Sequence, residues 1–349
     1  MPLARFFFVT ALILVLAECR KPPGEPDLVL RADTVAGGQS LSGSDSSGCA
    51  SADSVPPEDS IPRDTMPEDT LQEVPADPLP GARCARLELR GSLYGSLAEA
   101  LPGEDTDVLG AHAVRCMWWN LDPWRGLSAG DSLVILFGAG DMGLENRTIA
   151  LRYTPVAGSS NRAFSVYMFR KTGDSFPSYF YQDGTEAVKL LDVMPLTTFE
   201  EVTGIYGEPR GDHTHAGIDF KAPEGTPVRT AHGGVVARTD WNTEYNGHCV
   251  EIRMGAGYSE IFLHLRDIAP VVSPGASVPA GTTIGTVGNT GRSYSAHLHY
   301  QINDECDRPI DPCLFFGTHR RSLGASDMPA FQEFVTLCDS LMLARGSEP

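Results

Sequence analysis

The stretch GTTIGTVGNTGRSYSAHLHYQIN, residues 281–303, carries the pattern that decides the fold of this chain. Two short runs of β-forming residues flank a segment rich in Gly, Ser and Asn, which is typical of strands joined by turns. Within the second run, His297 and His299 are two residues apart. In an extended chain their side chains point to one face, while Leu298 points to the other. Paired imidazoles of this kind indicate either metal ligands or proton carriers.

The same sequence pattern extends over residues 200–317, where short runs of β-forming residues alternate with turns rich in Gly and Pro. Examples are GGVVARTDW (233–241), HCVEIRM (248–254) and YSEIFLHL (258–265). Strands at this spacing predict a compact antiparallel β domain.

Residues 83–199 predict a smaller mixed α/β domain in front of it. Its expected elements are a short helix, two strands and a hairpin that turns at Asp183-Gly184. In that order, they occupy SLYGSLAEALP (92–102), GLSAGDSLVILF (126–137), AFSVYMFR (163–170) and SYFYQDGTEAVKL (178–190).

The C-terminal tail, residues 318–349, predicts an amphipathic helix packed on a domain. Ser326 or Asp327 can cap this helix and Pro329 suits its first turn. Its apolar residues repeat at helical spacing: Phe331, Phe334, Val335, Cys338, Leu341 and Met342. We therefore expect an α+β fold, mostly β, that ends in a helix.

The chain has 349 residues and a formal net charge of −18, which allows two domains plus tails. Twelve acidic residues lie between Glu25 and Asp77, where Arg31 and Arg63 are the only basic residues. They belong to residues 20–82, which are rich in Pro and Ser and predict a disordered acidic linker. Binding to nucleic acid is not expected of so acidic a chain, because phosphate binding needs a basic face.

Residues 1–19 predict a signal peptide for export to the periplasm or cell envelope. Arg5 precedes the apolar run Phe6–Ala17, which is too short to span a bilayer. LAEC (16–19) resembles a bacterial lipoprotein signal, in which a lipid on Cys19 would tether the chain to a membrane. Simple secretion and a retained anchor are the alternatives.

The eight cysteines of an exported chain can form disulfides. Cys84–Cys116 and Cys306–Cys313 are plausible bridges by position, although spacing alone does not fix the connectivity. The sequence has no CxxC pair, which makes a zinc site built from cysteines unlikely.

HAGIDF (215–220) supplies a partner for the opening motif. Read as extended, His215 and Asp219 share one face. The histidines of HLH (297–299) share a face of another strand. Two histidines and one carboxylate, with an open position for water, are a catalytic zinc arrangement.

EIFLHL (260–265) adds His264. In a regular strand, His264 would share a face with Phe262 and lie opposite Leu263. Taken alone, such a histidine is more typical of a buried structural residue than of a catalytic one.

Three blocks of this sequence resemble the lysostaphin/LytM-type zinc metallopeptidases, which cut the peptide cross-links of peptidoglycan. The resemblance covers residues 204–313 and is specific, because the blocks occur together and in order. The blocks are GIYGEPRGDHTHAGIDFKAPEGTPV (204–228), EIFLHL (260–265) and GTTIGTVGNTGRSYSAHLHYQI (281–302).

The resemblance implies a role for each matching residue. His215, Asp219 and His299 would bind one Zn²⁺ per chain, and His264 and His297 would be catalytic. The substrate would be the stem peptides of peptidoglycan.

The chain also departs from this family and resembles a second group. Ser295-Ala296 stands where the family often has Gly-Pro, and Gln301 where it often has Glu. These departures would alter the shape of the loop or the hydrogen bonds made by the metal ligands.

Residues 83–199 resemble the region that precedes the peptidase domain in some Gram-negative endopeptidases. That implies D,D-endopeptidase activity and a domain that could regulate the peptidase.

Two other functions are compatible with parts of the pattern. A non-haem iron oxygenase also uses two histidines and a carboxylate, but it explains neither His264 nor the paired HxH. A non-catalytic cell-wall-binding or hydrolase-activating protein is the other alternative. Inactive relatives of this family usually lack some ligands, whereas this chain has all of them.

Overall fold

The computed structural model describes residues 79–138 and 146–344. The described residues belong to one compact unit. The expected signal peptide, Cys19 and residues 20–78 of the expected linker lie outside the described residues. Within the described part of the chain, no helix has both the length and the apolar character needed to cross a membrane.

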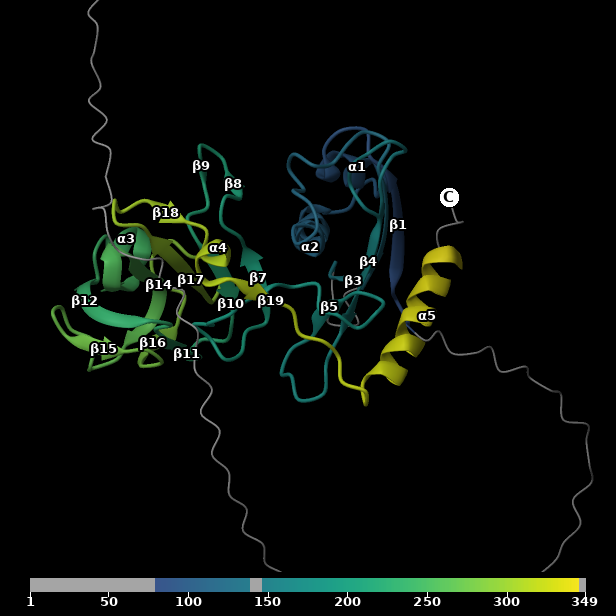
Figure 1. The fold of residues 1–349 in the computed structure, drawn as a ribbon. Coiled ribbons are helices and arrows are strands. Elements are labelled where there is room, and N and C mark those ends of the chain that lie inside the picture. Colours follow the sequence, from purple (N-terminus) through teal and green to yellow (C-terminus); the bar gives the residue numbers. More distant parts are fainter. Residues whose placement is uncertain (1–78, 139–145, 345–349) are drawn as a thin grey trace, which may run out of the picture. The chain divides into compact units, whose positions relative to one another are not determined.

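The first sheet is a five-stranded antiparallel meander with the strand order β1-β2-β3-β4-β5 (Figure 1). Its strands are β1 (Arg83–Glu88), β2 (Ser132–Phe137), β3 (Thr148–Thr154), β4 (Phe164–Phe169) and β5 (Ser178–Phe180). The segment after β5 turns back at Gly184, whose backbone N–H donates to the carbonyl of Tyr181 at 2.9 Å. This is the expected hairpin, shortened to a single bridge between Phe180 and Glu186.

Helices cover both faces of this sheet. On β2, Leu133 and Ile135 pack with α1 (Leu93–Ala100) and α2 (Asp107–Met117), while the alternate residues Val134 and Leu136 pack with α5 (Met328–Ala344). The apolar stripe of α5 therefore covers the first sheet, with Phe331 wholly buried. Figure 1 shows α5, in yellow, lying along this sheet although it is last in the sequence. The predicted C-terminal helix is confirmed.

The second sheet holds ten antiparallel strands, with the central order β15-β12-β13-β14-β17-β10-β7. Its strands are β7 (Glu201–Gly204), β10 (Ile218–Lys221), β11 (Pro227–Arg229), β12 (Gly233–Thr239), β13 (His248–Arg253), β14 (Ser259–Ile268), β15 (Ser277–Pro279), β16 (Thr283–Val287), β17 (His297–Asn303) and β18 (Pro309–Ile310). The sequence prediction of an antiparallel, mostly β fold is confirmed.

Short elements complete the fold. They are the hairpin of β8 (Pro209–Arg210) and β9 (His213–Thr214), the ribbon of β6 (Leu190–Leu191) and β19 (Thr318–His319), and the helices α3 (Thr243–Asn246), η2 (Gly255–Gly257) and α4 (Pro312–Phe316). The β6–β19 ribbon is the path by which the chain returns from the second sheet toward α5.

A buried carboxylate ties the second sheet together. Glu260 is fully buried and accepts hydrogen bonds from the Tyr300 hydroxyl at 2.7 Å and the Ala231 backbone N–H at 2.9 Å. The Thr230 hydroxyl also donates to it. Because a buried acid is costly unless its oxygens are hydrogen-bonded, this set locks β14 and β17 to the segment before β12.

The two suggested disulfides are wrong. Cys116 is a buried free thiol and Cys313 is a free thiol, so neither Cys84–Cys116 nor Cys306–Cys313 forms. Cys306 does take part in a disulfide. Burial raises the pKa of the Cys313 thiol to about 12, which keeps this thiol protonated and unreactive.

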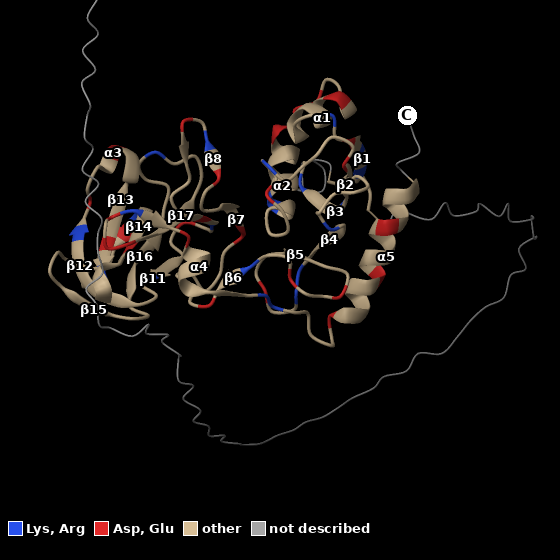
Figure 2. Ribbon diagram, turned by 45° about the horizontal axis from the view of Figure 1, so that its top comes forward, with Lys and Arg blue, Asp and Glu red and all other residues tan. Residues whose placement is uncertain are grey.

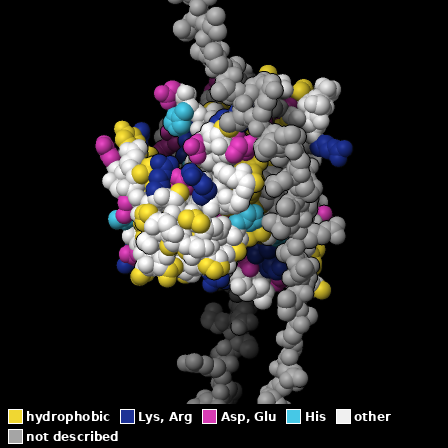
Figure 3. Space-filling view, turned by 60° about the vertical axis from the view of Figure 1, so that its left-hand side comes forward, with side chains coloured by type: hydrophobic (Ala, Val, Ile, Leu, Met, Phe, Trp, Pro, Cys, Tyr) yellow, Lys and Arg dark blue, Asp and Glu magenta, His cyan; other side chains and the backbone are white. Residues whose placement is uncertain are grey.

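Acidic and basic residues are spread over both sheets (Figure 2). Many are paired locally, such as Arg83 with Glu104 and Lys221 with Glu200 at 2.8 Å. On the face drawn in Figure 3, hydrophobic side chains are scattered among polar ones, and basic side chains lie beside acidic ones.

Candidate metal centre

Strand register brings the two histidine motifs together. In the antiparallel pairing of β10 with β17, Asp219 lies directly opposite His299 and Lys221 opposite His297. Residues paired across two strands point to the same face. On the other face, Phe220 and its partner Leu298 are 2% and 0% exposed and belong to the core. The alternation expected from both motifs is therefore confirmed.

Three ligand-type side chains converge on one point. His215 Nε2 lies 3.1 Å from Asp219 Oδ1 and 3.0 Å from His299 Nδ1. His299 Nδ1 lies 2.9 Å from the same Asp219 oxygen. All three residues are buried, and they form a group able to hold a metal ion.

The outer nitrogen of each histidine ligand has a partner that sets the tautomer. His215 Nδ1 lies 3.0 Å from the Ile205 carbonyl, which can only accept, so Nδ1 carries the proton. His299 Nε2 lies 3.2 Å from Gln301 Oε1, and the Gln301 amide nitrogen donates to Asn303 Oδ1 at 2.6 Å. This pairing fixes the amide with its oxygen toward His299.

Two lone-pair nitrogens and one carboxylate oxygen thus face one another at about hydrogen-bond distance. Without a positive charge between them, three acceptors in a buried place would repel one another. Two imidazoles and a carboxylate are ligands that suit Zn²⁺. The residues present therefore fit a zinc ion.

The second oxygen of Asp219 binds an arginine that the sequence reasoning missed. Arg210 Nη2 lies 2.7 Å from Asp219 Oδ2 and 3.2 Å from Glu208 Oε2. This ion pair offsets the cost of burying the carboxylate charge. Asp219 is thus an ionised carboxylate, as a ligand must be. Arg210 lies nine residues away in the β8–β9 hairpin, and no motif marked it.

His264 reaches the site through an irregularity in β14. The expectation that His264 shares a face with Phe262 and opposes Leu263 is wrong. Leu263 pairs with His299 across β14 and β17, and both Leu263 and His264 line the cavity around the metal group. His264 has a φ of +64°, and the pairing of β13 with β14 changes register beside it. This β-bulge places the His264 imidazole on the cavity face of the strand, opposite to the face that regular alternation predicts.

His264 and His297 form a second pair beside the three ligands. Their ring centroids are 4.8 Å apart, and His297 Nε2 lies 3.8 Å from Asp219 Oδ1. The Nδ1–H of His264 donates to the Thr290 carbonyl at 2.9 Å, and that of His297 to the Ser295 carbonyl at 2.8 Å. Both rings therefore turn Nε2 away from these carbonyls. Burial, followed by the charge of His297, lowers the pKa of His264 to about 4, so its ring is neutral at neutral pH.

All five histidine and aspartate residues singled out by the sequence line one open cavity of about 690 Å³. Tyr245, Arg292 and Tyr294 also line it, and the motifs did not mark them. Residues 213–312 match Peptidase family M23.

These residues form a peptidase M23 domain.

Curated relatives of the M23 domain include two proteins of Vibrio cholerae serotype O1. This chain is 46% identical to the peptidoglycan DD-endopeptidase ShyA over 144 residues, which are 37% of this chain and 33% of ShyA. It is 37% identical to the peptidoglycan DD-endopeptidase ShyC over 136 residues, which are 37% of this chain and 30% of ShyC. The chain thus spans about a third of the length of these relatives.

Among solved structures, a zinc-containing peptidase from Vibrio cholerae is 23% identical, with a TM-score of 0.32 over 66% of this chain and 69% of that chain.

Glycines let the strands of the M23 domain approach closely enough to form the metal group. A Cβ on Gly217 would lie 2.3 Å from the Tyr300 carbonyl oxygen and 3.1 Å from His299 Nε2. A Cβ on Gly204 would lie 2.6 Å from Asp219 Oδ2. Both positions exclude a side chain, because real Cβ contacts are longer than 3 Å.

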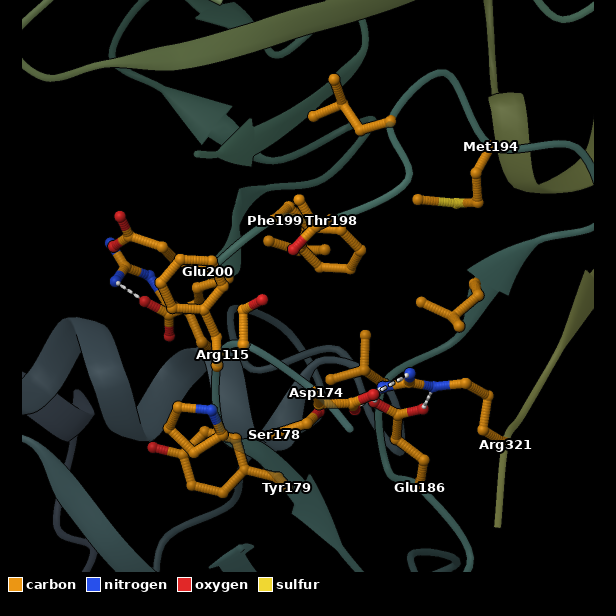
Figure 4. Close-up of a pocket in the computed structure, with 18 of the residues that line it drawn as sticks. Arg115, Asp174, Ser178, Tyr179, Glu186, Met194, Thr198, Phe199, Glu200 and Arg321 are labelled. Carbon is orange, nitrogen blue, oxygen red and sulfur yellow. Dashed lines mark hydrogen bonds and ion pairs between the residues drawn. The ribbon is translucent and has the colours of Figure 1, made fainter. Parts of the chain in front are cut away.

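A second cavity, of about 490 Å³, shares no lining residue with the histidine cavity. Figure 4 shows Arg321 beside Glu186 and Asp174, which it binds at 2.7 Å and 3.0 Å. Arg115, on the same cavity wall, binds Glu201 at 3.0 Å. Glu186 is almost fully buried, so these contacts offset the cost of burying its charge. We therefore interpret these groups as structural.

Proposed function

We propose that this chain is a zinc-dependent peptidoglycan endopeptidase of the D,D type, which hydrolyses peptide cross-links of the bacterial cell wall. One observation carries the proposal: three lone-pair donors, on His215, Asp219 and His299, converge beside the paired rings of His264 and His297. The names of the Vibrio relatives supply the substrate class.

In this proposal His215, Asp219 and His299 hold the zinc ion. When bound, zinc supplies Lewis acidity, which polarises a peptide carbonyl and makes water a better nucleophile. The Ile205 carbonyl and Gln301 keep the two imidazole ligands in the binding tautomer.

The chain's own proton chemistry belongs to His264 and His297. One of them accepts a proton from the attacking water through its free Nε2, as a general base. The oxygen of that water adds to the carbonyl carbon, and the other histidine, with a proton on its Nε2, stabilises the developing negative charge. The C–N bond then breaks, and a histidine returns the proton to the leaving amine. Both Nδ1 protons are already held by backbone carbonyls, so in this proposal each histidine exchanges its proton through Nε2.

We also propose the domain organisation and location. Residues 1–19 would export the chain, residues 20–82 would act as a spacer, and residues 83–199 would form a domain able to regulate the M23 domain. A lipid on Cys19 would hold the chain at a membrane of the cell envelope, and the spacer would give reach to the wall.

Alanine at either catalytic histidine tests the mechanism. His264→Ala and His297→Ala should each keep one bound zinc per chain but lose at least about 100-fold in cleavage of purified peptidoglycan. His319→Ala is the matched control, because this exposed histidine binds Asp192 at 3.0 Å and lies outside the cavity. Full activity in either variant would contradict the mechanism. Binding of peptidoglycan without cleavage by the unaltered chain would instead favour a non-catalytic wall-binding protein.

A further inference from the structure

Arg292 is an exposed cation on the wall of the histidine cavity. The other arginine there, Arg210, is neutralised by Asp219 and Glu208. Arg292 has no ion pair or side-chain hydrogen bond with any residue in the described part of the chain. Its charge acts weakly on the exposed Asp212, as the smallest of the causes that lower the pKa of that carboxyl. In a chain of net charge −18, an arginine without a close carboxylate can bind an anion from outside.

The backbone that carries Arg292 is fixed. Its N–H donates to the Tyr245 carbonyl at 2.9 Å. The preceding residue, Gly291, has a φ of +71°, and a Cβ there would lie 2.2 Å from the backbone nitrogen of Gly247. The two loops are thus in contact through their backbones, which removes much of the freedom that a surface arginine would otherwise lose on binding.

The same loop supports the catalytic pair. Thr290, two residues before Arg292, gives its carbonyl to His264 and its hydroxyl to the Leu265 carbonyl at 2.6 Å. Arg292 therefore projects from a segment whose position is tied to that of His264. A ligand held by Arg292 would lie in the same cavity as the metal group.

Acidic groups do not compete for Arg292 inside this cavity. Asp219 is the only carboxylate among the residues lining it, and it is bound by Arg210. The nearby Asp212, on the β8–β9 turn, makes its contact with His213 at 3.0 Å. Arg210 is already paired, so among the described lining residues Arg292 is the cation left to meet an anionic substrate.

We propose that Arg292 is a specificity-determining residue that binds a free carboxylate of the stem peptide next to the cleaved bond. The inference rests on the proposed peptidase function. The residue that supplies the amine of a cross-link can carry a free carboxylate on the carbon that bears that amine. The planar guanidinium donates two parallel hydrogen bonds to the two oxygens of a carboxylate and also neutralises its charge. An amide is uncharged and has only one acceptor oxygen, so it cannot pair with the guanidinium in this way. The chain should therefore prefer cross-links with a free carboxylate over amidated ones.

The test compares kcat/KM of the full-length zinc-loaded chain on two cross-linked muropeptides, one with the free diaminopimelate carboxylate and one with that carboxylate amidated. The unaltered chain should cleave the free form at least about tenfold better. Arg292→Gln should lose about tenfold on the free form and little on the amidated form, so that the preference nearly disappears. Arg292→Lys should retain part of this preference, because lysine keeps the positive charge but lacks the two parallel N–H donors of the guanidinium.

Arg253→Gln is the matched control, since this exposed arginine lies outside the cavity and its loss changes the net charge equally. It should leave the preference unchanged. An unaltered preference in Arg292→Gln would overturn the proposal, as would equal cleavage of both muropeptides by the unaltered chain. That second result would leave the proposed peptidase function intact. If the unaltered chain cleaved neither substrate, the proposed function itself would be wrong, and this inference with it.

Discussion

Gln301 is the side chain that orients His299 toward the metal group. Its amide oxygen accepts from His299 Nε2–H, and its amide nitrogen is held by Asn303. Partners of this kind are worth 10–100-fold in metal affinity. We expect Gln301→Leu to weaken zinc binding by about that factor in a competition titration with a chromophoric chelator. Gln301→Glu, which keeps an acceptor, should stay within a few-fold of the unaltered chain. Equal zinc affinity in all three would mean that Gln301 does not position His299.

His264 occupies a left-handed backbone conformation, with a φ of +64°. A residue with a Cβ pays about 1–2 kcal/mol for this conformation, whereas glycine does not. His264→Gly should therefore be about 1 kcal/mol more stable than His264→Ala in urea unfolding, although glycine usually destabilises a strand. Both variants lose the same hydrogen bond to Thr290, so the comparison isolates the backbone. A more stable alanine variant would mean that the bulge relaxes without glycine.

At the scale of the elements, the site depends on how closely β10 approaches β17. Gly217→Ala would place a methyl group against the Tyr300 carbonyl and His299, which should push the strands apart and separate the ligands. We expect loss of stoichiometric zinc binding, measured by metal analysis after gel filtration. Gly255→Ala should bind zinc normally, because a Cβ there meets nothing within 4 Å. Normal zinc binding by Gly217→Ala would show that the pairing tolerates this shift.

The strand pattern of the M23 domain could be predicted because its side chains alternate regularly. Asp219, His297 and His299 lie where a period of two puts them, with Phe220 and Leu298 in the core behind. Alternation fails at a bulge, where one extra residue reverses the face of everything after it.

For that reason the position of His264 followed from family resemblance and not from the pattern. Arg210 and Arg292 were missed for a related reason. Each acts from a short loop or hairpin, where no period links sequence position to direction. Contacts between distant loops, such as that of Arg292 with Tyr245, arise only from tertiary packing.

At the scale of the whole molecule, the chain leaves the M23 domain and completes the first sheet. β19 pairs with β6, Arg321 binds the buried Glu186, and α5 then covers one face of the meander. The apolar stripe of α5 predicted a packed helix, but helical spacing does not reveal which sheet it covers. Since the core of the first sheet includes residues that follow the M23 domain, functional tests should use the full-length chain.

The most direct test of the account is mass spectrometry of cross-linked muropeptides after incubation with the full-length chain. With zinc bound, the account predicts that dimers become monomers whose summed mass exceeds that of the dimer by one water. Removing zinc with a chelator should stop the reaction, and adding zinc back should restore it. Unchanged dimers in the presence of the zinc-loaded chain would contradict the central claim that this site hydrolyses peptidoglycan cross-links.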